Sequence, residues 1–437
     1  MLILPRRLLA ACVLLAACDS PSGSGNAVPS TPAEWLEQNA HPISSISPAD
    51  RDFRDLRPLR QAIGDARVVM LGEQSHGDGA TFLAKARLIA FLHEEMGFDV
   101  LVWESGMYDV ERVWAQIAAG EDVITASRRG IFGIWTGSEQ VLATLDYVAS
   151  RTRAARPLEM AGFDMQLTTD GPHDSLGINL GRLAREIGSP VADDPAWPAA
   201  MATLRGLATG AHWVNKPDSA AQRSVLELLG RLRGDAAAAG GRRGAWWEKV
   251  LESTAEYARV VWAEPPFPAP ATAEGGNARE DQMAKNLVWL ANEHYRGRKI
   301  IVWAASLHIA RAVDGLVTPG GRAGGGNGWV PMGEQVHRVL GDQMYAVGFT
   351  AARGSFGRGA SVTPVTRMME GSLEAHLEAT GMPYAFIDLR SPGPGGDWLK
   401  DVYAMPFGYG WMRGDWTRVL DGMVYTRDMT PSTRATR

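Results

Sequence analysis

A glutamate and a histidine stand three residues apart in segment 72–77, which reads GEQSHG, directly after the apolar run 68–71. The apolar run predicts a buried strand, so Glu73 and His76 would be delivered together at its carboxyl end. Ligands of open α/β sheets bind at that end of the strands, and the flanking glycines let the backbone turn sharply or approach a substrate closely. Chemistry is therefore expected at this loop.

Ionisable residues also follow three further predicted strands. Glu104 ends the run LVWE, Asp164 ends GFD, and His308 follows WAASL. A single charged residue at a strand end is usually structural, because it caps a helix or forms a salt bridge. Repetition at four strands indicates a polar cleft, since a buried charge without a partner costs on the order of several kcal/mol.

The elements that must position these residues follow from apolar periodicity. Short apolar runs predict strands at 68–71, 100–103, 159–163, 300–304, 345–349, 385–387 and 423–425, and helical patterns cover 81–96, 139–150 and 280–295. Several strands are continuous apolar runs, which are typical of strands buried on both faces. We expect an α/β fold with a central mixed, largely parallel sheet flanked by helices. The stretch of about 175–260 has helical composition and predicts a helical insertion over the cleft.

The amino terminus has the features of a secretory signal. Arg6 and Arg7 precede an apolar stretch that ends in LAAC at Cys18, and this stretch is about half the roughly 20 residues that a membrane-spanning helix needs. We expect a signal peptide at 1–17, lipidation of Cys18, a flexible tether at 18–31 and the folded domain at 32–437. The protein would be an exported cell-envelope lipoprotein on the periplasmic side of the inner or outer membrane, held there by the lipid on Cys18.

Composition restricts the remaining functions. The formal net charge is -5, so no basic excess indicates nucleic acid as a partner. The chain has two cysteines. Processing at Cys18 would remove Cys12 with the signal, so we expect neither a disulfide, nor a thiolate metal site, nor a cysteine nucleophile in the folded domain.

Segment 69–104 is similar to the defining segment of the erythromycin esterase family. It holds the Gly-Glu-x-x-His-Gly loop, a following helix, and a Gly-Phe turn before a strand that ends in Glu104. Further matches occur in the family's order, at 162–164, 279–286, the strand before His308, 332–334, 388–390 and 420–422. The resemblance covers nearly all of the expected mature chain.

The resemblance implies a single α/β domain with a helical portion over a deep cleft, which hydrolyses a small-molecule ester or lactone. It implies water activated by histidine, with neither a covalent serine intermediate nor an essential metal or cofactor. Carried onto this chain, His76 would be the general base, Glu73 and Glu104 would orient and tune it, and His308 and Arg279 would complete the cleft. An imidazole beside a carboxylate is a competent base near neutral pH.

Two other polar residues are candidates for substrate binding. Asp164 ends its strand at the same edge. Arg87 lies on the helix after the His76 loop, where it would either pair with a cleft carboxylate or contact the substrate.

One element departs from the family pattern. The family has His-Asn-x-His after the strand at 300–304, whereas this chain has Ala305 and Ser306 at the first two positions. His308 is therefore the only histidine of that element. The substrate then differs from that of the family, or activity is reduced or lost.

Alternatives remain open. Two histidines with two glutamates could bind zinc or iron in a metal-dependent hydrolase, although no short His-x-x-x-His spacing supports this. A lipoprotein that binds its ligand without turnover would keep the same cleft. Ser75 is disfavoured as a nucleophile because a Gly-x-Ser-x-Gly elbow is absent. The substrate stays open between a macrolide antibiotic, with a role in resistance, an envelope polysaccharide ester and a secreted metabolite.

Overall fold

The computed structural model describes residues 28–167, 175–210, 215–265, 272–326 and 328–436. The predicted signal peptide, Cys18 and most of the predicted tether lie outside these residues. No helix in the described part of the chain is long and apolar enough to cross a membrane.

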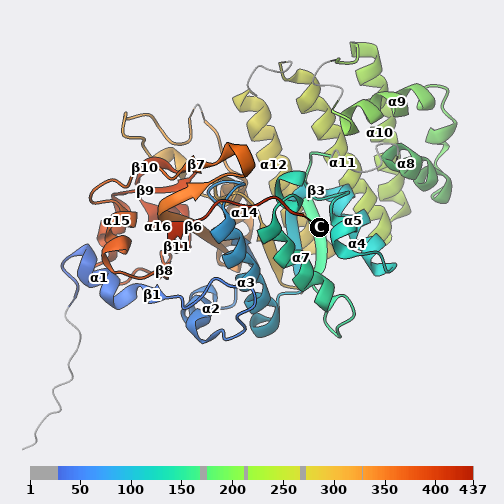
Figure 1. The fold of residues 1–437 in the computed structure, drawn as a ribbon. Coiled ribbons are helices and arrows are strands. Elements are labelled where there is room, and N and C mark those ends of the chain that lie inside the picture. The colour runs from blue at the N-terminus through green and yellow to red at the C-terminus, as the bar shows by residue number, and fades with distance from the viewer. Residues whose placement is uncertain (1–27, 168–174, 211–214, 266–271, 327, 437) are drawn as a thin grey trace, which may run out of the picture.

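A mixed sheet of nine strands forms the centre of the described structure (Figure 1). Six neighbouring strands run parallel to one another, in the order β11 (Gly422–Met429), β6 (Met344–Phe356), β2 (Val68–Leu71), β5 (Ile300–Trp303), β3 (Val100–Gly106) and β4 (Glu159–Asp164). Beyond β11 the antiparallel strands β8 (Tyr384–Asp388) and β1 (His41–Pro42) close one edge, and β7 (Thr363–Pro364) pairs with β6. The carboxyl ends of the six parallel strands therefore share one edge of the sheet.

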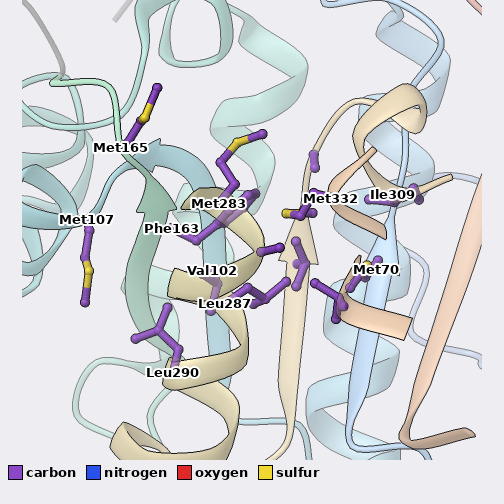
Figure 2. Packing of buried hydrophobic residues seen from close by; sticks show 14 of the residues in the cluster. Met70, Val102, Met107, Phe163, Met165, Met283, Leu287, Leu290, Ile309 and Met332 are labelled. Carbon is purple, nitrogen blue, oxygen red and sulfur yellow. The ribbon is translucent and has the colours of Figure 1, made fainter. Parts of the chain in front are cut away.

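Alternate residues of the parallel strands enter two hydrophobic clusters on the two faces of the sheet. Val68 and Met70 belong to one cluster, and Val69 and Leu71 belong to the other. All four are fully buried. Figure 2 shows strand residues of the first cluster packed against α12 (Ala273–Trp289). Burial on both faces explains why these strands read as continuous apolar runs.

Helices cover both faces of this sheet. The second cluster includes residues of α2 (Arg57–Ile63), α3 (Gly79–Met96), α4 (Met107–Ala118), α5 (Val123–Ser127) and α7 (Glu139–Arg151). The first includes residues of α1 (Pro32–Asn39), α14 (Met332–Leu340), α15 (Leu373–Ala379) and α16 (Trp416–Val419). The short helices α6 (Gly133–Thr136) and α13 (Ser306–Ile309) lie in the loops after β3 and β5, and β9 (Val402–Phe407) with β10 (Gly410–Gly414) forms a separate hairpin.

The predicted strands and helices agree with this arrangement. Each of the seven predicted strands is present, and the largely parallel α/β sheet is confirmed. Helix α3 ends where expected, at Gly97 in the left-handed conformation. Helix α12 begins earlier than predicted and continues as one π-helical turn, Leu290–His294.

The stretch 175–260 is helical in its described residues. It forms α8 (Ser175–Glu186), α9 (Trp197–Ala208), α10 (Ser219–Ala239) and α11 (Gly241–Ala263), and α11 packs on α12. In Figure 1 α8, α9 and α10 lie at the upper right of the molecule, whereas β9, β10 and α15 lie at the left.

One buried carboxyl group couples the stability of this fold to pH. Glu374 on α15 accepts hydrogen bonds from the Thr350 hydroxyl on β6 and from the Met405 N–H on β9. Both partners are neutral, and burial raises the pKa of Glu374 to about 7. Between the ordinary glutamate pKa and about 7, the folded state keeps a proton that the unfolded state has lost. Stability therefore falls as pH rises through this window.

The variant Glu374→Gln should remove this pH dependence, because it stays neutral. We expect it to be more stable than the wild type by about 1–3 kcal/mol at pH 8 and to differ little from it at pH 4. Urea unfolding at both pH values measures the difference. The same pH dependence in both proteins would contradict the assignment.

Candidate active site

The loops after β2 and β5 are joined directly beneath the predicted site. The Ser306 N–H donates to the Glu73 carbonyl at 2.8 Å. A Cβ atom on Gly72 would lie 2.5 Å from the Ser306 Oγ atom, so the close approach of these loops requires glycine at 72. Asp78 closes the His76 loop by accepting from the Ser75 N–H at 2.8 Å.

Glu73 is a fully buried carboxylate whose two oxygens both have partners. Oε1 accepts from Trp135 Nε1 at 2.7 Å and lies 2.9 Å from His76 Nδ1. Oε2 lies 2.7 Å from Nζ of Lys85, which is itself fully buried on α3 and sits 3.8 Å from the centre of the Trp303 ring. Burial alone would raise the pKa of Glu73, but the charge of Lys85 and the contact with His76 hold it below its usual value. Burial lowers the pKa of Lys85 to about 8 despite the opposing effect of Glu73.

This pairing sets the tautomer of His76. An ionised carboxylate can only accept hydrogen bonds, so Nδ1 carries a proton and Nε2 is left with its lone pair. The His76 side chain is 44% exposed, whereas Glu73 is inaccessible. Burial lowers the pKa of His76, but the hydrogen bond and charge of Glu73 outweigh it, and the net shift is upward. His76 thus has the orientation that a general base needs.

A second group of charges forms around Glu104 at the end of β3. Its Oε1 lies 3.0 Å from Nη2 of Arg279, and its Oε2 accepts from the Ala305 N–H at 2.9 Å. The same Arg279 nitrogen lies 2.6 Å from Oδ2 of Asp164. Burial opposes ionisation of Glu104, but His308, Arg279 and the Ala305 N–H hold its pKa far below the usual range.

His308 lies between two carboxylates. Its Nε2 is 3.1 Å from Oε1 of Glu104, and its Nδ1 is 2.5 Å from Oε1 of Glu280. Burial would lower the pKa of His308, yet the two carboxylates raise it to about 10. At neutral pH His308 is therefore an imidazolium with both N–H groups engaged, so it supplies positive charge and does not act as a base.

Glu73, His76 and His308 line one pocket of about 770 Å³, whereas Glu104 and the predicted substrate-binding residue Arg279 do not. Large apolar side chains form other parts of the lining, from Leu307, Trp329, Phe356, Phe407 and Met412. Four glycines also line it, Gly324, Gly325, Gly326 and Gly408. No described residue of the helical insertion lines this pocket, and a separate cavity of about 600 Å³ between α8 and α9 contains none of the converging residues. A few polar groups facing apolar walls are typical of a small-molecule site.

The structure brings together Glu73, His76, Glu104, His308 and Arg279, with Asp164 beneath Arg279. Asp164 is buried and its carboxylate is taken up by Arg279, so it supports that arginine instead of facing the pocket.

The placement of Arg87 corrects the prediction for that residue. Its guanidinium is buried away from the cleft, where it pairs with both Asp55 oxygens and donates to the carbonyls of Ser45 and Asp52. It holds segment 45–55 against α3 and contacts neither a cleft carboxylate nor the pocket. The helical repeat of α3 could not show this pairing, because segment 45–55, which holds the partners of Arg87, has no regular sequence pattern.

Three residues of the site were not predicted as such. Lys85 and Trp135 hold Glu73, and Glu280 holds His308. A lysine within the apolar repeat of α3 is a signal that the sequence offered, since a buried lysine needs an acidic partner. Trp135 lies on the four-residue helix α6, which is too short for a periodic pattern to mark it.

The donor atoms of this site do not fit a metal ion. The carboxylate oxygens of Glu73 and Glu104 are occupied by Lys85, Trp135, Arg279 and a backbone N–H. Across the described ranges, no group of three His, Cys, Asp or Glu side chains could hold a metal ion.

Replacing Lys85 should show how much this lysine contributes to the free energy of unfolding by neutralising Glu73. Lys85→Met leaves a buried carboxylate without its cation, and we expect a loss of about 3–5 kcal/mol in the free energy of unfolding at pH 7. The double variant Lys85→Met with Glu73→Gln should recover part of this loss, because the uncompensated charge is gone.

The matched control is Lys285→Met, which removes an exposed lysine paired with Asp281. Urea unfolding should show a change of at most about 0.5 kcal/mol for this control. An equally small change for Lys85→Met would contradict the role of Lys85.

Comparisons with known proteins agree with this architecture. The Erythromycin esterase family profile matches residues 93–422, which include Glu104, Arg279 and His308 and begin after the His76 loop. YbfO of Bacillus subtilis (strain 168) is 24% identical over 432 residues, with 91% of each chain covered. Erythromycin esterase type II of Escherichia coli is 22% identical over 388 residues, covering 82% of this chain and 88% of its own. A solved mutant of the erythromycin esterase EreC, in its open conformation, has a TM-score of 0.66 at 16% identity and covers 88% of this chain and 96% of its own. Because the family profile spans most of the chain, this protein belongs to the erythromycin esterase family.

Proposed function

We propose that this protein is an envelope-tethered hydrolase that cleaves an ester or lactone with a water molecule activated by His76. Family membership supports hydrolysis as the class of reaction. The observation that carries the mechanism is the contact between His76 Nδ1 and buried Glu73, which turns the free Nε2 into a base at the pocket.

In the proposed reaction, His76 Nε2 takes a proton from water as the water oxygen attacks the carbonyl carbon of the substrate. Glu73 stabilises the imidazolium that forms. The negative charge that develops on the carbonyl oxygen is favoured by the positive charge of His308, which lines the same pocket. When the tetrahedral intermediate collapses, the proton on His76 passes to the leaving alkoxide. The products are one carboxylic acid and one alcohol, joined in a single molecule when the substrate is a lactone.

A ligand-binding lipoprotein without turnover is the second candidate. Ala305 and Ser306, in place of the family's His-Asn, are the observation that favours it. Ala305 lines the pocket with only a methyl group, so the site lacks one imidazole at this position. The remaining base, its carboxylate and the charge of His308 are sufficient for the mechanism above, and we therefore favour hydrolysis.

The substrate remains a choice among a macrolide, an envelope polysaccharide ester and a secreted metabolite. The pocket favours a molecule with a large apolar part, because aromatic side chains and Met412 form much of its lining.

Replacing the proposed base tests the mechanism. On a panel of esters and macrolactones, we expect His76→Asn to lower kcat by about 10²–10⁴-fold, because general-base catalysis contributes roughly that factor. Steady-state kinetics on each hydrolysed substrate give the measurement. Wild-type turnover that survives in the variant would overturn the role of His76.

The control is His376→Asn, which changes a histidine packed on Trp398 away from the pocket and should leave kcat unchanged. Assays after dialysis against a chelator distinguish this mechanism from that of a metal-dependent hydrolase. A metal-dependent hydrolase would lose activity on dialysis and regain it when metal is added. Ligand binding without any wild-type turnover across the panel would favour the binding lipoprotein.

The location is a separate part of the proposal and rests on the amino-terminal sequence. We expect the full-length protein to fractionate with membranes when expressed in a Gram-negative host, and Cys18→Ser to move it to the soluble fraction or leave it as unprocessed precursor. Cys12→Ser is the control and should not change fractionation. Membrane association that persists in Cys18→Ser with an unmodified, processed amino terminus would contradict the lipid anchor.

A further inference from the structure

The chain after β11 crosses the His76 loop and ties it to the start of α7. The Gly79 N–H donates to the Thr430 carbonyl at 2.8 Å, and the Ser432 N–H donates to the Gly77 carbonyl at 2.8 Å. The Glu139 N–H donates to the Thr433 carbonyl at 3.0 Å, and the Ala435 N–H donates to the Gly137 carbonyl at 2.9 Å. This segment, 430–435, follows the region matched by the family profile, which ends at 422.

A second segment holds the same loop from the end of β6. The Gly357 N–H donates to the Gly77 carbonyl at 3.1 Å, so that carbonyl accepts from both segments. A Cβ atom on Gly77 would lie 2.3 Å from the Gly357 backbone, and one on Gly79 would lie 2.6 Å from the Pro431 carbonyl oxygen. The two glycines that flank Asp78 are therefore required by chain segments pressed against the loop on both sides.

Arg358 connects these segments to the partners of Glu73. Its Nε donates to the Ser432 hydroxyl at 3.1 Å, and that hydroxyl donates to the buried Ser138 hydroxyl at 2.7 Å. Its Nη2 donates to the Ile134 carbonyl at 2.6 Å and lies 3.5 Å from the His76 carbonyl. Ile134 is on α6, which also carries Trp135.

His76 and Trp135 both contact Glu73 Oε1, and Arg358 binds backbone carbonyls at or next to both residues. Arg358 reaches the carbonyl of His76 itself and the carbonyl next to Trp135. Neither the arginine nor segment 430–435 lines the pocket. Their contacts fix the loop and α6 relative to Glu73 and leave the substrate untouched.

We propose that Arg358 and Ser432 are positioning residues, which hold the His76 side chain in contact with Glu73 and fix the position of Trp135 beside it. The "C-terminal clamp" is Arg358 together with residues 430–435. The inference rests on the proposed function, because it assigns the clamp to the base of that reaction. Loss of the clamp lets the His76 loop shift, and a misplacement of about 1 Å can cost roughly 10²-fold in rate.

The kinetic test compares Arg358→Ala and Ser432→Ala with wild type on a hydrolysed ester. We expect kcat to fall at least tenfold in Arg358→Ala and by a smaller factor in Ser432→Ala, which leaves the contacts of Arg358 with the His76 and Ile134 carbonyls in place. KM should stay within about threefold, since the clamp does not touch the substrate. Arg358→Lys should recover part of kcat, because it keeps a cation that can reach one carbonyl.

The matched control is Arg353→Ala on β6, the strand that ends just before Arg358. Arg353 is exposed and pairs with Asp428 and Glu378, away from the loop. Its loss should leave kcat unchanged. Loss of thermal stability in Arg358→Ala with kcat as in wild type would show that the clamp is only structural and would overturn the proposal.

A readout that does not need turnover separates this inference from the proposed function. Histidine ring signals in NMR, assigned with His76→Asn, give the pKa of His76 directly. Removing the positive charge of Arg358 would by itself raise this pKa. Loosening the contact with Glu73 would lower it, because that contact is what raises it against burial. We expect a lower pKa in Arg358→Ala.

The outcomes are distinguishable. Absence of wild-type hydrolysis, with a lowered His76 pKa in Arg358→Ala, refutes the proposed function and leaves the clamp standing. An unchanged or raised pKa refutes the clamp, whether or not the wild type hydrolyses esters.

Discussion

The interaction on which this site depends is the buried ion pair between Glu73 and Lys85. A carboxylate without solvent would ordinarily take up a proton, and a neutral Glu73 would no longer force the proton of His76 onto Nδ1. Lys85 prevents this from a fully buried position against the Trp303 ring. The pair thus links the hydrophobic packing of α3 on the sheet to the protonation state of the proposed base.

The two histidines of the pocket illustrate how environment separates two chemically identical groups. His76 contacts one carboxylate through Nδ1, is partly exposed and lines the pocket. His308 contacts carboxylates through both nitrogens and is held as a cation. In the proposed mechanism, one imidazole acts as the base and the other supplies fixed positive charge.

Parallel topology explains how residues so distant in sequence reach one place. Six strands end at the same edge, so the ends of β3 and β4 and the loops after β2 and β5 bring their polar residues close together. Chain segments from far along the sequence then fix those loops. Arg279 bridges the ends of β3 and β4, and the C-terminal clamp lies on the loop after β2.

The α/β sheet, its strands and the ionisable residues at the strand ends could be predicted from the amino-acid sequence, because apolar period and residue type report local conformation and burial directly. Which charges meet depends on how distant segments pack. Trp135 reaches Glu73 across 62 residues, and Arg87 turns from the cleft to Asp55 although it lies two residues after Lys85 on the same helix. A helical repeat shows that a side chain is buried but does not identify its partner, since that partner is set by how distant segments pack. The different environments of His76 and His308 depend on such partners, and for that reason they appear only in three dimensions.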